Sequence, residues 1–360
     1  MTPRQHVLDA AQAVGFDLVR FAAVGPTPHM AAFDTWIAEE KHGEMAYLAR
    51  GRDIRADPRA RMPGAQTAVV LALPHHHRRP PDPGGRTGLV ARYAWGRDYH
   101  NIIGKRLKKL RRALRERGID SWGGVDTAPI LERSWASASG MGFSGKNCTQ
   151  ILVGETSWLF LAVLFVDSSI APDPPLDDHC GTCTRCLHHC PTDAFDGPRV
   201  LDARRCIAYW TIEAKGLPPR ALRPAFGRWF FGCDLCQEVC PHNHAPPDAD
   251  LDDLLPRNAW IDLDDILATP DEALLERYRG TPLRRPKGPG LKRNAALVLG
   301  NLGDDGAVDG LRQHGLSHPA PVVRAASVWA LQRLGAPPDL RDPDPGVQEE
   351  LRLGAGRCDM

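Results

Sequence analysis

Cysteines dominate the residues whose type and spacing could support chemistry in this chain. The first run, at 180–190, has four cysteines in the order C-x2-C-x2-C-x3-C and is followed by Pro191; the second, at 233–240, repeats the last three cysteines and ends at Pro241. Soft thiolates at these intervals bind metal, and the spacing is that of two-cluster bacterial ferredoxins. The pattern therefore predicts an electron-carrying segment with two [4Fe–4S] clusters rather than zinc, which usually takes paired C-x2-C hooks.

The ligand sets follow from the rule that the fourth cysteine of each run binds the other cluster. Phe230 stands where a full second run would begin, which leaves the second cluster one thiolate short, and Cys206 completes that set. We assign the first cluster to Cys180, Cys183, Cys186 and Cys240, and the second to Cys190, Cys206, Cys233 and Cys236. Cys148 is interpreted as a small core residue and Cys358 as a thiol of the tail.

Composition limits the class of protein. The chain has 360 residues, enough for two or three domains, and its 45 basic and 44 acidic residues mean that a nucleic-acid partner requires a local basic patch. The longest apolar stretch, 158–166, is far shorter than the roughly 20 residues that span a bilayer, and residues 1–30 lack the apolar core of a signal peptide. We therefore expect a cytoplasmic protein without a membrane partner.

The N-terminal half alternates helical and strand patterns. We predict an amphipathic helix within 1–23 with a short strand at 18–21, a helix at 33–48 and a buried strand at 66–73. This alternation predicts a sheet covered by helices. The loop that follows carries His75–His77 among prolines and glycines, which favours a solvated loop over a metal site because adjacent side chains rarely converge on one ion.

Residues 105–117 predict a helix with eight basic residues and one acid. Its leucines hold one face to the core, so most of the positive charge must face outward. A solvated helix and a surface that contacts phosphates are both compatible with this segment.

Two further motifs resemble functional sites but also have structural interpretations. Asp126 or Thr127, before Pro129 and an apolar stretch, fits a helix N-cap better than a catalytic carboxylate on spacing alone. The segment 140–147 satisfies G-x-G-x-x-G, but a helix is expected before it and strands after it, the reverse of a nucleotide-binding loop. We interpret it as a glycine-rich loop that lets the backbone approach something bulky.

The C-terminal region repeats itself. Residues 292–303 align with 324–335 at an offset of 32, which predicts stacked helix pairs as in HEAT-type arrays. The fold class is α+β and multidomain, with predicted domains at 1–170, 171–255 and 291–360 and a connecting segment at 256–290.

Several spaced motifs together resemble the epoxyqueuosine reductase family, whose members use cobalamin and iron–sulfur clusters in tRNA queuosine synthesis. The resemblance rests on H-G-E-M-A-Y-L at 42–48, G-R-D-Y-H at 96–100, D-T-A-P-I-L-E-R at 126–133, the glycine loop, the cysteine pattern with Cys206, and R-N-A-A at 293–296. It implies an N-terminal α/β domain that holds cobalamin, a ferredoxin-like domain with two [4Fe–4S] clusters and a C-terminal helical HEAT-like domain. The implied reaction removes the epoxide oxygen of epoxyqueuosine at the wobble position of tRNA.

The resemblance also implies roles for individual residues. The family's general acid falls on Asp126, which replaces the N-cap interpretation; a carboxyl buried beside a corrin is expected to have a raised pKa. Residues expected near the corrin are Tyr99, His100, Gly142, Gly145 and Lys146. Residues expected to contact tRNA are Lys105, Lys108, Lys109, Arg112, Arg284, Arg285, Lys287 and Arg293.

The implied partners are epoxyqueuosine-containing tRNA and an external electron donor, and the chain is expected to be a monomer. Two alternatives remain open: a corrinoid iron–sulfur reductase of a small molecule, similar to reductive dehalogenases, and a ferredoxin-type electron carrier that is not an enzyme. The first leaves the basic segments without a role, and the second leaves the N-terminal domain and Asp126 without one.

Overall fold

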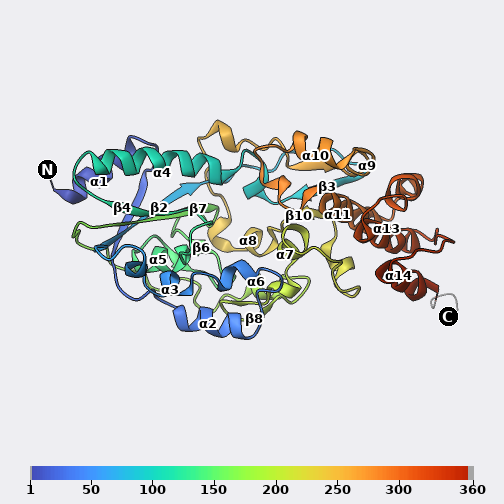
Figure 1. Cartoon of the computed structure of the whole chain (residues 1–360), viewed down its shortest axis with the longest axis horizontal. Coiled ribbons are helices and arrows are strands. Elements are labelled where there is room, and N and C mark those ends of the chain that lie inside the picture. Colours follow the sequence, from blue (N-terminus) through green and yellow to red (C-terminus); the bar gives the residue numbers. More distant parts are fainter. Residues whose placement is uncertain (1, 356–360) are drawn as a thin grey trace. The chain divides into compact units, whose positions relative to one another are not determined.

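The chain forms two compact units, each of which is described by itself. The computed structural model describes residues 2–355, and Figure 1 labels its elements. Unit 1 contains residues up to 78, 97–202 and 235–254, and unit 2 contains 79–96, 203–234 and the residues from 255 onward. These units differ from the predicted domains because the chain enters each unit more than once, so that the cysteine region contributes to both.

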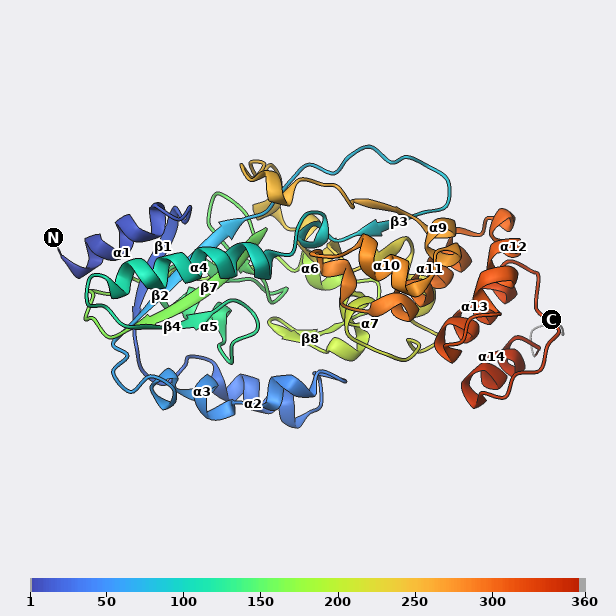
Figure 2. The same cartoon turned by 45° about the horizontal axis from the view of Figure 1, so that its top comes forward.

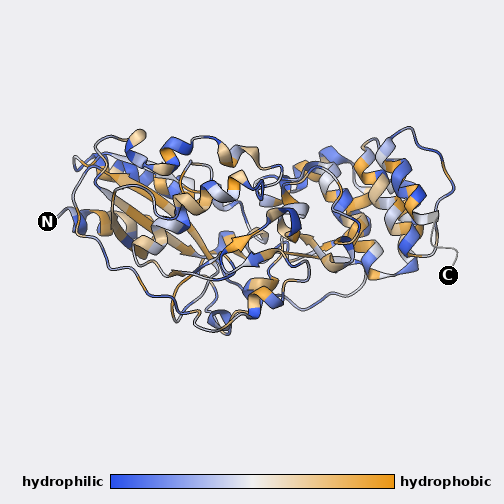
Figure 3. Cartoon of the chain, turned by 90° about the horizontal axis from the view of Figure 1, so that it is seen from below, coloured by the Kyte–Doolittle hydropathy of each residue, from blue (hydrophilic) through white to orange (hydrophobic). Residues whose placement is uncertain are grey.

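Unit 1 is built on a four-stranded antiparallel sheet in the order β1-β2-β7-β4. Its strands are β1 (Leu18–Ala23), β2 (Thr67–Pro74), β4 (Ser121–Gly124) and β7 (Leu159–Val166). Both central strands are almost entirely apolar, as Figure 3 shows in orange, because both faces of the sheet are buried. The buried strand predicted at 66–73 is therefore confirmed.

Helices cover both faces of this sheet. Helices α1 and α4 lie on one side and α5 on the other, where Trp135 packs against Val70 and Phe165 (Figures 1 and 2). The helices of unit 1 are α1 (Pro3–Gln12), α2 (Met30–Ala38), α3 (Arg52–Ala56), α4 (Tyr99–Arg115), α5 (Glu132–Ala138), α6 (Arg185–His188) and α8 (Leu235–Glu238). Two small hairpins complete it: β5 (Phe143–Ser144) with β6 (Gln150–Ile151), and β8 (Phe195–Gly197) with β9 (Val200–Leu201).

Two predicted helix boundaries were wrong. The helix predicted at 33–48 ends at Ala38, because Glu40 and Gly43 adopt left-handed backbone angles with φ of 55° and 58°. The helix expected to begin at Asp126 or Thr127 begins at Glu132 instead, so neither residue is its N-cap.

The prediction of a solvated loop at His75–His77 was also wrong. His75 and His77 are each only 6% exposed, and the His75 ring stacks on Phe160 with centroids 4.2 Å apart. The carbonyl oxygen of His76 accepts a hydrogen bond from the amide of Ala249.

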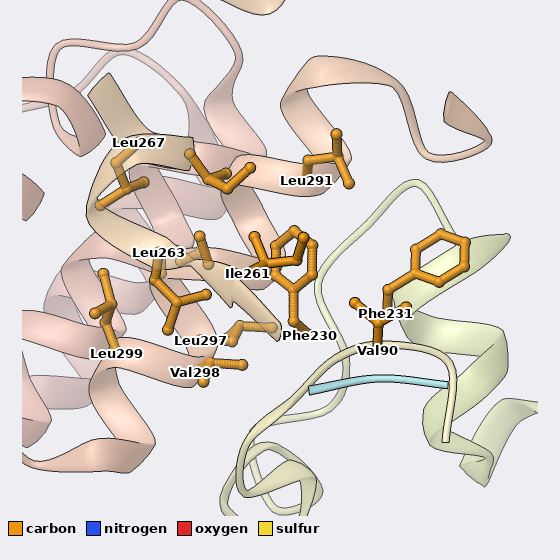
Figure 4. Packing of buried hydrophobic residues seen from close by; sticks show 14 of the residues in the cluster. Val90, Phe230, Phe231, Ile261, Leu263, Leu267, Leu291, Leu297, Val298 and Leu299 are labelled. Carbon is orange, nitrogen blue, oxygen red and sulfur yellow. The ribbon is translucent and has the colours of Figure 1, made fainter. Parts of the chain in front are cut away.

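Unit 2 has a three-stranded sheet in the order β10-β3-β11. Its strands are β10 (Trp229–Phe231), β3 (Thr87–Val90) and β11 (Trp260–Asp262), with β10 parallel and β11 antiparallel to β3. Gly88 is required in β3 because a Cβ there would lie 2.6 Å from the Cβ of Phe230. Figure 4 shows Phe230 packed among Leu263 and Leu297, in a core that joins this sheet to the helices.

Helices make up the rest of unit 2. They are α7 (Ile207–Ile212), α9 (Leu263–Ala268), α10 (Asp271–Arg277), α11 (Lys287–Leu302), α12 (Val308–Gly310), α13 (Pro321–Arg333) and α14 (Pro345–Ala355). The segment 256–290, predicted to be a connection, is instead structured, because it forms β11, α9 and α10. In the chain from 2 to 355, none of the helices combines the length and hydrophobicity that a bilayer-spanning segment requires.

The two repeated segments form α11 and α13, which pack together. Both segments end at a left-handed glycine, Gly303 with φ of 70° and Gly335 with φ of 69°. The shared ending that revealed the repeat is therefore a helix terminator, a position at which glycine costs little.

Candidate functional site

Asp126 lies in the loop between β4 and α5 of unit 1. Its side chain is 62% exposed, and its backbone φ of 55° is unusual for a residue other than glycine. The amide of Asp126 donates a hydrogen bond of 2.8 Å to Oε1 of Glu132. This contact connects the loop to the first turn of α5.

His100 connects Asp126 to the start of α4. Its Nε2 lies 2.8 Å from Oδ2 of Asp126, and its Nδ1 lies 2.7 Å from Oδ1 of Asp98. Asp98 is also the N-cap of α4, because its Oδ1 accepts from the amide of His100. Burial lowers the pKa of His100, but the hydrogen bonds to Asp126 and Asp98 outweigh burial and raise the pKa to about 9. At neutral pH the ring is therefore an imidazolium that donates to both carboxylates.

The expectation that Asp126 is a buried carboxyl was wrong. Its side chain is 62% exposed, and its Oδ2 lies 2.8 Å from Nε2 of His100. The nearby carboxyl with a raised pKa is that of Glu132, where burial raises the pKa to about 7 and the charge of Asp126 adds to the increase.

A basic groove adjoins this pair. The groove has a volume of about 770 Å³ and is lined on one side by His100, Val125 and Thr127. Its other lining residues come from β4 and from the basic face of α4: Gly104, Leu107, Lys108, Lys109, Arg111, Arg112, Arg115, Gly123 and Gly124. The basic residues of α4 thus face a cavity beside two ionisable side chains, which favours a ligand-contacting surface over a purely solvated one.

The predicted tRNA contacts on α4 divide around this groove. Lys108, Lys109 and Arg112 line it, whereas Lys105 is exposed on the same helix outside the lining. Arg111, which was not predicted, also lines the groove, but one of its nitrogens donates to the carbonyl oxygen of Ser121. The sequence therefore located the basic helix correctly but not which of its side chains share one cavity.

The glycine loop has a packing role of its own. A Cβ on Gly142 would lie 2.1 Å from the carbonyl oxygen of Ile151, and one on Gly145 would lie 2.6 Å from Cδ1 of the same residue. Both glycines therefore allow close packing within the β5–β6 hairpin. The expected context of the loop is confirmed, because α5 precedes it and β6 and β7 follow it.

Lys146 is held by the first cysteine run. Its Nζ donates to the carbonyl oxygens of Gly181 at 2.7 Å and Cys183 at 2.9 Å, and its amide lies 3.4 Å from Sγ of Cys180. The ammonium that was expected near a corrin is therefore occupied by the cysteine loop.

The four cysteines assigned to the first cluster line one cavity of about 150 Å³ in unit 1, together with Lys146, Asn147 and His242. Burial raises the pKa of the Cys186 thiol to about 11, and Cys180, Cys240 and Cys183 add to the increase. The cavity therefore brings together the four cysteines that the sequence pattern assigns to the first cluster.

Polar contacts fix the cysteine loops. Oδ1 of Asp178 accepts from the amide of Cys180, and Oδ2 pairs with Arg199 at 2.6 Å. In the second run, Nδ2 of Asn147 donates to the carbonyl oxygen of Cys236 at 3.0 Å. These hydrogen bonds fix the backbone that carries the thiols of Cys180 and Cys236.

The remaining cysteines are not gathered in one unit. Cys190 and Cys236 belong to unit 1, and Cys206 and Cys233 belong to unit 2, so their joint assignment to the second cluster rests on the sequence pattern. Burial raises the pKa of Cys148. Cys358 lies outside the described residues.

Arg293 was wrongly predicted to contact tRNA. It is fully buried in unit 2, where its guanidinium donates to the carbonyl oxygens of Ala214, Gly216 and Trp210 at 2.6 to 2.8 Å. A guanidinium with these contacts cannot reach a phosphate. Arg284, Arg285 and Lys287, which were predicted with it, are exposed.

Comparison with known proteins supplies the family. The family model described as "Epoxyqueuosine reductase QueG, DUF1730" matches residues 55–127, and the model of a 4Fe-4S double cluster binding domain matches residues 179–243. The epoxyqueuosine reductase of Pseudomonas aeruginosa is 37% identical over 348 residues, which cover 92% of this chain and 94% of that protein. The chain belongs to the epoxyqueuosine reductase family. The enzyme of Gloeobacter violaceus, 38% identical over 311 residues, covers 83% of this chain and 96% of that protein.

Solved epoxyqueuosine reductases share the fold. The structure from Streptococcus thermophilus has a TM-score of 0.91 at 26% identity and covers 100% of both chains. A structure of an epoxyqueuosine reductase with an epoxyqueuosine-modified tRNA-Tyr stem loop has a TM-score of 0.89 at 28% identity and covers 98% of both chains. As a member of this family the chain is an oxidoreductase, and neither the dehalogenase-like alternative nor the electron carrier is favoured. The double-cluster match supports two [4Fe–4S] clusters.

Sequence reasoning missed three residues of this epoxyqueuosine reductase site. Asp98 and Glu132 lie inside the G-R-D-Y-H and D-T-A-P-I-L-E-R motifs, so the motifs contained them without indicating what they contact. Phe160 of β7, which stacks on Tyr99 with centroids 4.4 Å apart, carried no signal beyond that of a strand residue.

Proposed function

We propose that this chain reduces epoxyqueuosine to queuosine at the wobble position of tRNA. The reaction consumes two electrons and two protons and releases the epoxide oxygen as water. Family membership supports this proposal, as does the related enzyme that was solved with an epoxyqueuosine-modified tRNA stem loop. The observation that carries it is the exposed Asp126, paired with His100, beside a groove lined by the basic side chains of α4.

Two [4Fe–4S] clusters supply the electrons in this proposal. Cys180, Cys183, Cys186 and Cys240 hold the first, and their common cavity fits such a group. Cys190, Cys206, Cys233 and Cys236 hold the second, by the ferredoxin pattern. An external electron donor reloads the clusters.

Cobalamin is the proposed cofactor at which the epoxide is reduced. When bound, a low-valent corrin supplies the strong low-potential nucleophile that no amino-acid side chain provides. The groove beside Asp126 supports this placement because half-buried glycines without side chains, Gly123 and Gly124, line it and leave room for a large ring. Of the residues first expected near the corrin, Tyr99 and His100 lie at this end of α4, whereas Gly142, Gly145 and Lys146 are engaged elsewhere in unit 1.

Asp126 is the proposed proton donor to the epoxide oxygen. Its carboxyl is exposed beside the groove, within reach of a substrate bound there, and Glu132 holds its backbone. A Bacillus subtilis relative, 27% identical with a TM-score of 0.86, was solved with its catalytic aspartate loop swung out of the active site. The loop of Asp126, with its left-handed backbone, is the corresponding candidate for movement.

We further propose that tRNA phosphates contact Lys105, Lys108, Lys109 and Arg112 in unit 1 and Arg284, Arg285 and Lys287 in unit 2. Exposed cations suit this role because phosphate contacts dominate the affinity of nucleic-acid complexes. The stacked α11 and α13 form the core of the proposed HEAT-like domain. The enzyme is proposed to act as a cytoplasmic monomer.

The test of this function is direct. Anaerobically reconstituted and reduced protein is incubated with cobalamin and epoxyqueuosine-containing tRNA, and the nucleosides are analysed by mass spectrometry. We expect queuosine to replace epoxyqueuosine only when both cobalamin and reductant are present. The absence of queuosine from protein with intact clusters would refute the proposed function.

The cluster assignment has its own test, with a matched control in the same chain. Wild-type protein is expected to carry about eight irons, and Cys206→Ala about four, because one cluster loses a ligand. Cys148→Ala removes a cysteine outside both ligand sets and should keep about eight. Equal iron contents in the two variants would contradict the role of Cys206.

A further inference from the structure

The proposed reaction needs two protons, and the Asp126 carboxylate that pairs with His100 must take up each proton before it can donate it to the epoxide oxygen. The epoxide has two C–O bonds: the first breaks as electrons arrive from the clusters, and its oxygen takes a proton. The second breaks when that oxygen takes another proton and leaves as water. A single carboxyl can serve both events only if it is reprotonated while the substrate is bound.

We propose that His100 is the positioning residue that reprotonates Asp126, with Asp98 holding the imidazole in place. This inference rests on the proposed function. Nε2 of His100 lies 2.8 Å from Oδ2 of Asp126, so a proton can pass along an existing hydrogen bond. Transfer leaves a neutral imidazole whose remaining proton is on Nδ1, 2.7 Å from Asp98. That carboxylate therefore fixes the tautomer with its Nε2 lone pair towards Asp126.

A column of stacked rings holds the imidazole in this position. The ring of Tyr99 stacks on His100 at 4.1 Å and on Phe160 at 4.4 Å, and Phe160 stacks on His75 at 4.2 Å. The four rings come from α4, β7 and the end of β2. Because Phe160 lies in β7 and His75 directly follows β2, the column connects His100 to the two central strands of the sheet.

The charges around the pair support proton storage on His100. Its side chain is 33% exposed, so solvent can return the proton after each transfer. The pKa of about 9 keeps the ring charged at neutral pH. The other charged groups that face the pair are Glu132 and Arg55 on the side of α5 and α3, and Lys108, Lys109, Arg111, Arg112 and Arg115 in the groove.

The test compares His100→Gln with Asp98→Asn and with the distant control His6→Gln. Glutamine keeps a donor near Asp126 but cannot titrate. In single-turnover reactions with saturating tRNA, we expect the wild-type rate to fall near pH 9, and we expect His100→Gln to be about 10²-fold slower and to lack that fall. Asp98→Asn should shift that fall to lower pH, and His6→Gln should match wild type. The affinities for tRNA and cobalamin are measured by titration in parallel, so that a loss of rate is separated from a loss of binding.

A second measurement does not depend on turnover. Histidine-labelled protein is titrated by NMR. The chemical shift of His100 is expected to titrate with a midpoint near pH 9 in wild type and at a lower pH in Asp126→Asn. An unshifted wild-type His100, or a His100→Gln enzyme with the wild-type rate and pH profile, would overturn the inference. So would a slower His100→Gln whose loss is matched by weaker cobalamin or tRNA binding. If wild type makes no queuosine, the proposed function fails, whereas the NMR titration still decides whether the ion pair exists.

Discussion

At the scale of single residues, the behaviour of Asp126 depends on groups distant in sequence. The D-T-A-P-I-L-E-R motif identified Asp126 as the candidate acid, and that assignment remains a proposal. Its partner His100 is 26 residues earlier in the chain, and only the packing of α4 along the sheet brings the two together. The sequence could not predict that pairing, because it depends on where a helix N-terminus meets a loop.

Glu132 offers a test of the electrostatics at this scale. Its pKa is raised from 4.5 to about 7, so between these values the folded protein holds a proton that the unfolded chain has lost. Wild-type stability should therefore fall as pH rises through this window and then level off. Glu132→Gln cannot ionise at this position. The difference between its free energy of unfolding and that of wild type should therefore increase in favour of the variant by at most about 3 kcal/mol between pH 4.5 and 8.

Urea unfolding at several pH values measures this difference. The exposed Glu272 of α10 provides the control, since Glu272→Gln should keep a constant offset from wild type. His100 also contributes to the pH dependence, but through its protonated, charged form. Its stabilisation is complete below pH 6.5 and is lost as pH rises through about 9, equally in wild type and in Glu132→Gln. A constant offset for Glu132→Gln would show that its carboxyl is not perturbed.

At the scale of elements, α4 combines structural and functional roles. Asp98 caps the helix, and Ile103, Leu107, Leu110 and Leu114 bury one face. The apolar spacing predicted this helix, and the remaining positions had to be exposed. What the spacing could not give was the groove, because its far wall is β4, which follows α4 in the chain and pairs with β7.

The groove residues should control tRNA affinity. Replacing Lys108, Lys109 and Arg112 with alanine removes up to three phosphate contacts, so the slope of log affinity against log salt should decrease by about 2. Filter binding over a range of salt concentrations measures the slope. The control is Arg279→Ala with Arg352→Ala, two exposed arginines that each pair with a glutamate three residues earlier in the chain. Equal slopes in the two variants would place the tRNA elsewhere.

Arg293 and Arg284 provide a matched pair in unit 2. Arg293→Ala removes a fully buried side chain and leaves three backbone carbonyl oxygens without their donor, so we expect a loss of about 3 kcal/mol or more in the free energy of unfolding. Arg284→Ala is exposed and should change stability by less than about 0.5 kcal/mol while weakening tRNA binding. Thermal unfolding and tRNA titration of both variants check this. A stable Arg293→Ala protein with weakened tRNA binding would restore the original prediction.

At the scale of the whole chain, local sequence patterns predicted the individual elements better than they predicted the domain boundaries. The buried strand, the basic helix, the paired cysteine runs and the repeated helices were all found from spacing. The predicted domain limits differ from the compact units because strand β3, at 87–90, pairs with β10 and β11, which lie more than 130 residues later. Long-range pairing of this kind leaves no signal in local periodicity. The same limit explains why the burial of Arg293 was not predicted, because its hydrogen-bond acceptors belong to α7 and to the loop after it.

The central claim is that this chain reduces epoxyqueuosine in tRNA with Asp126 as the proton donor. Its most direct test is the single-turnover conversion of epoxyqueuosine-containing tRNA by wild type and Asp126→Asn, both reconstituted with clusters and cobalamin. We predict that wild type forms queuosine and that Asp126→Asn, with unchanged iron content and tRNA affinity, is slower by about 10² to 10⁴-fold. Equal rates for the two proteins, or no queuosine from wild type, would contradict the account.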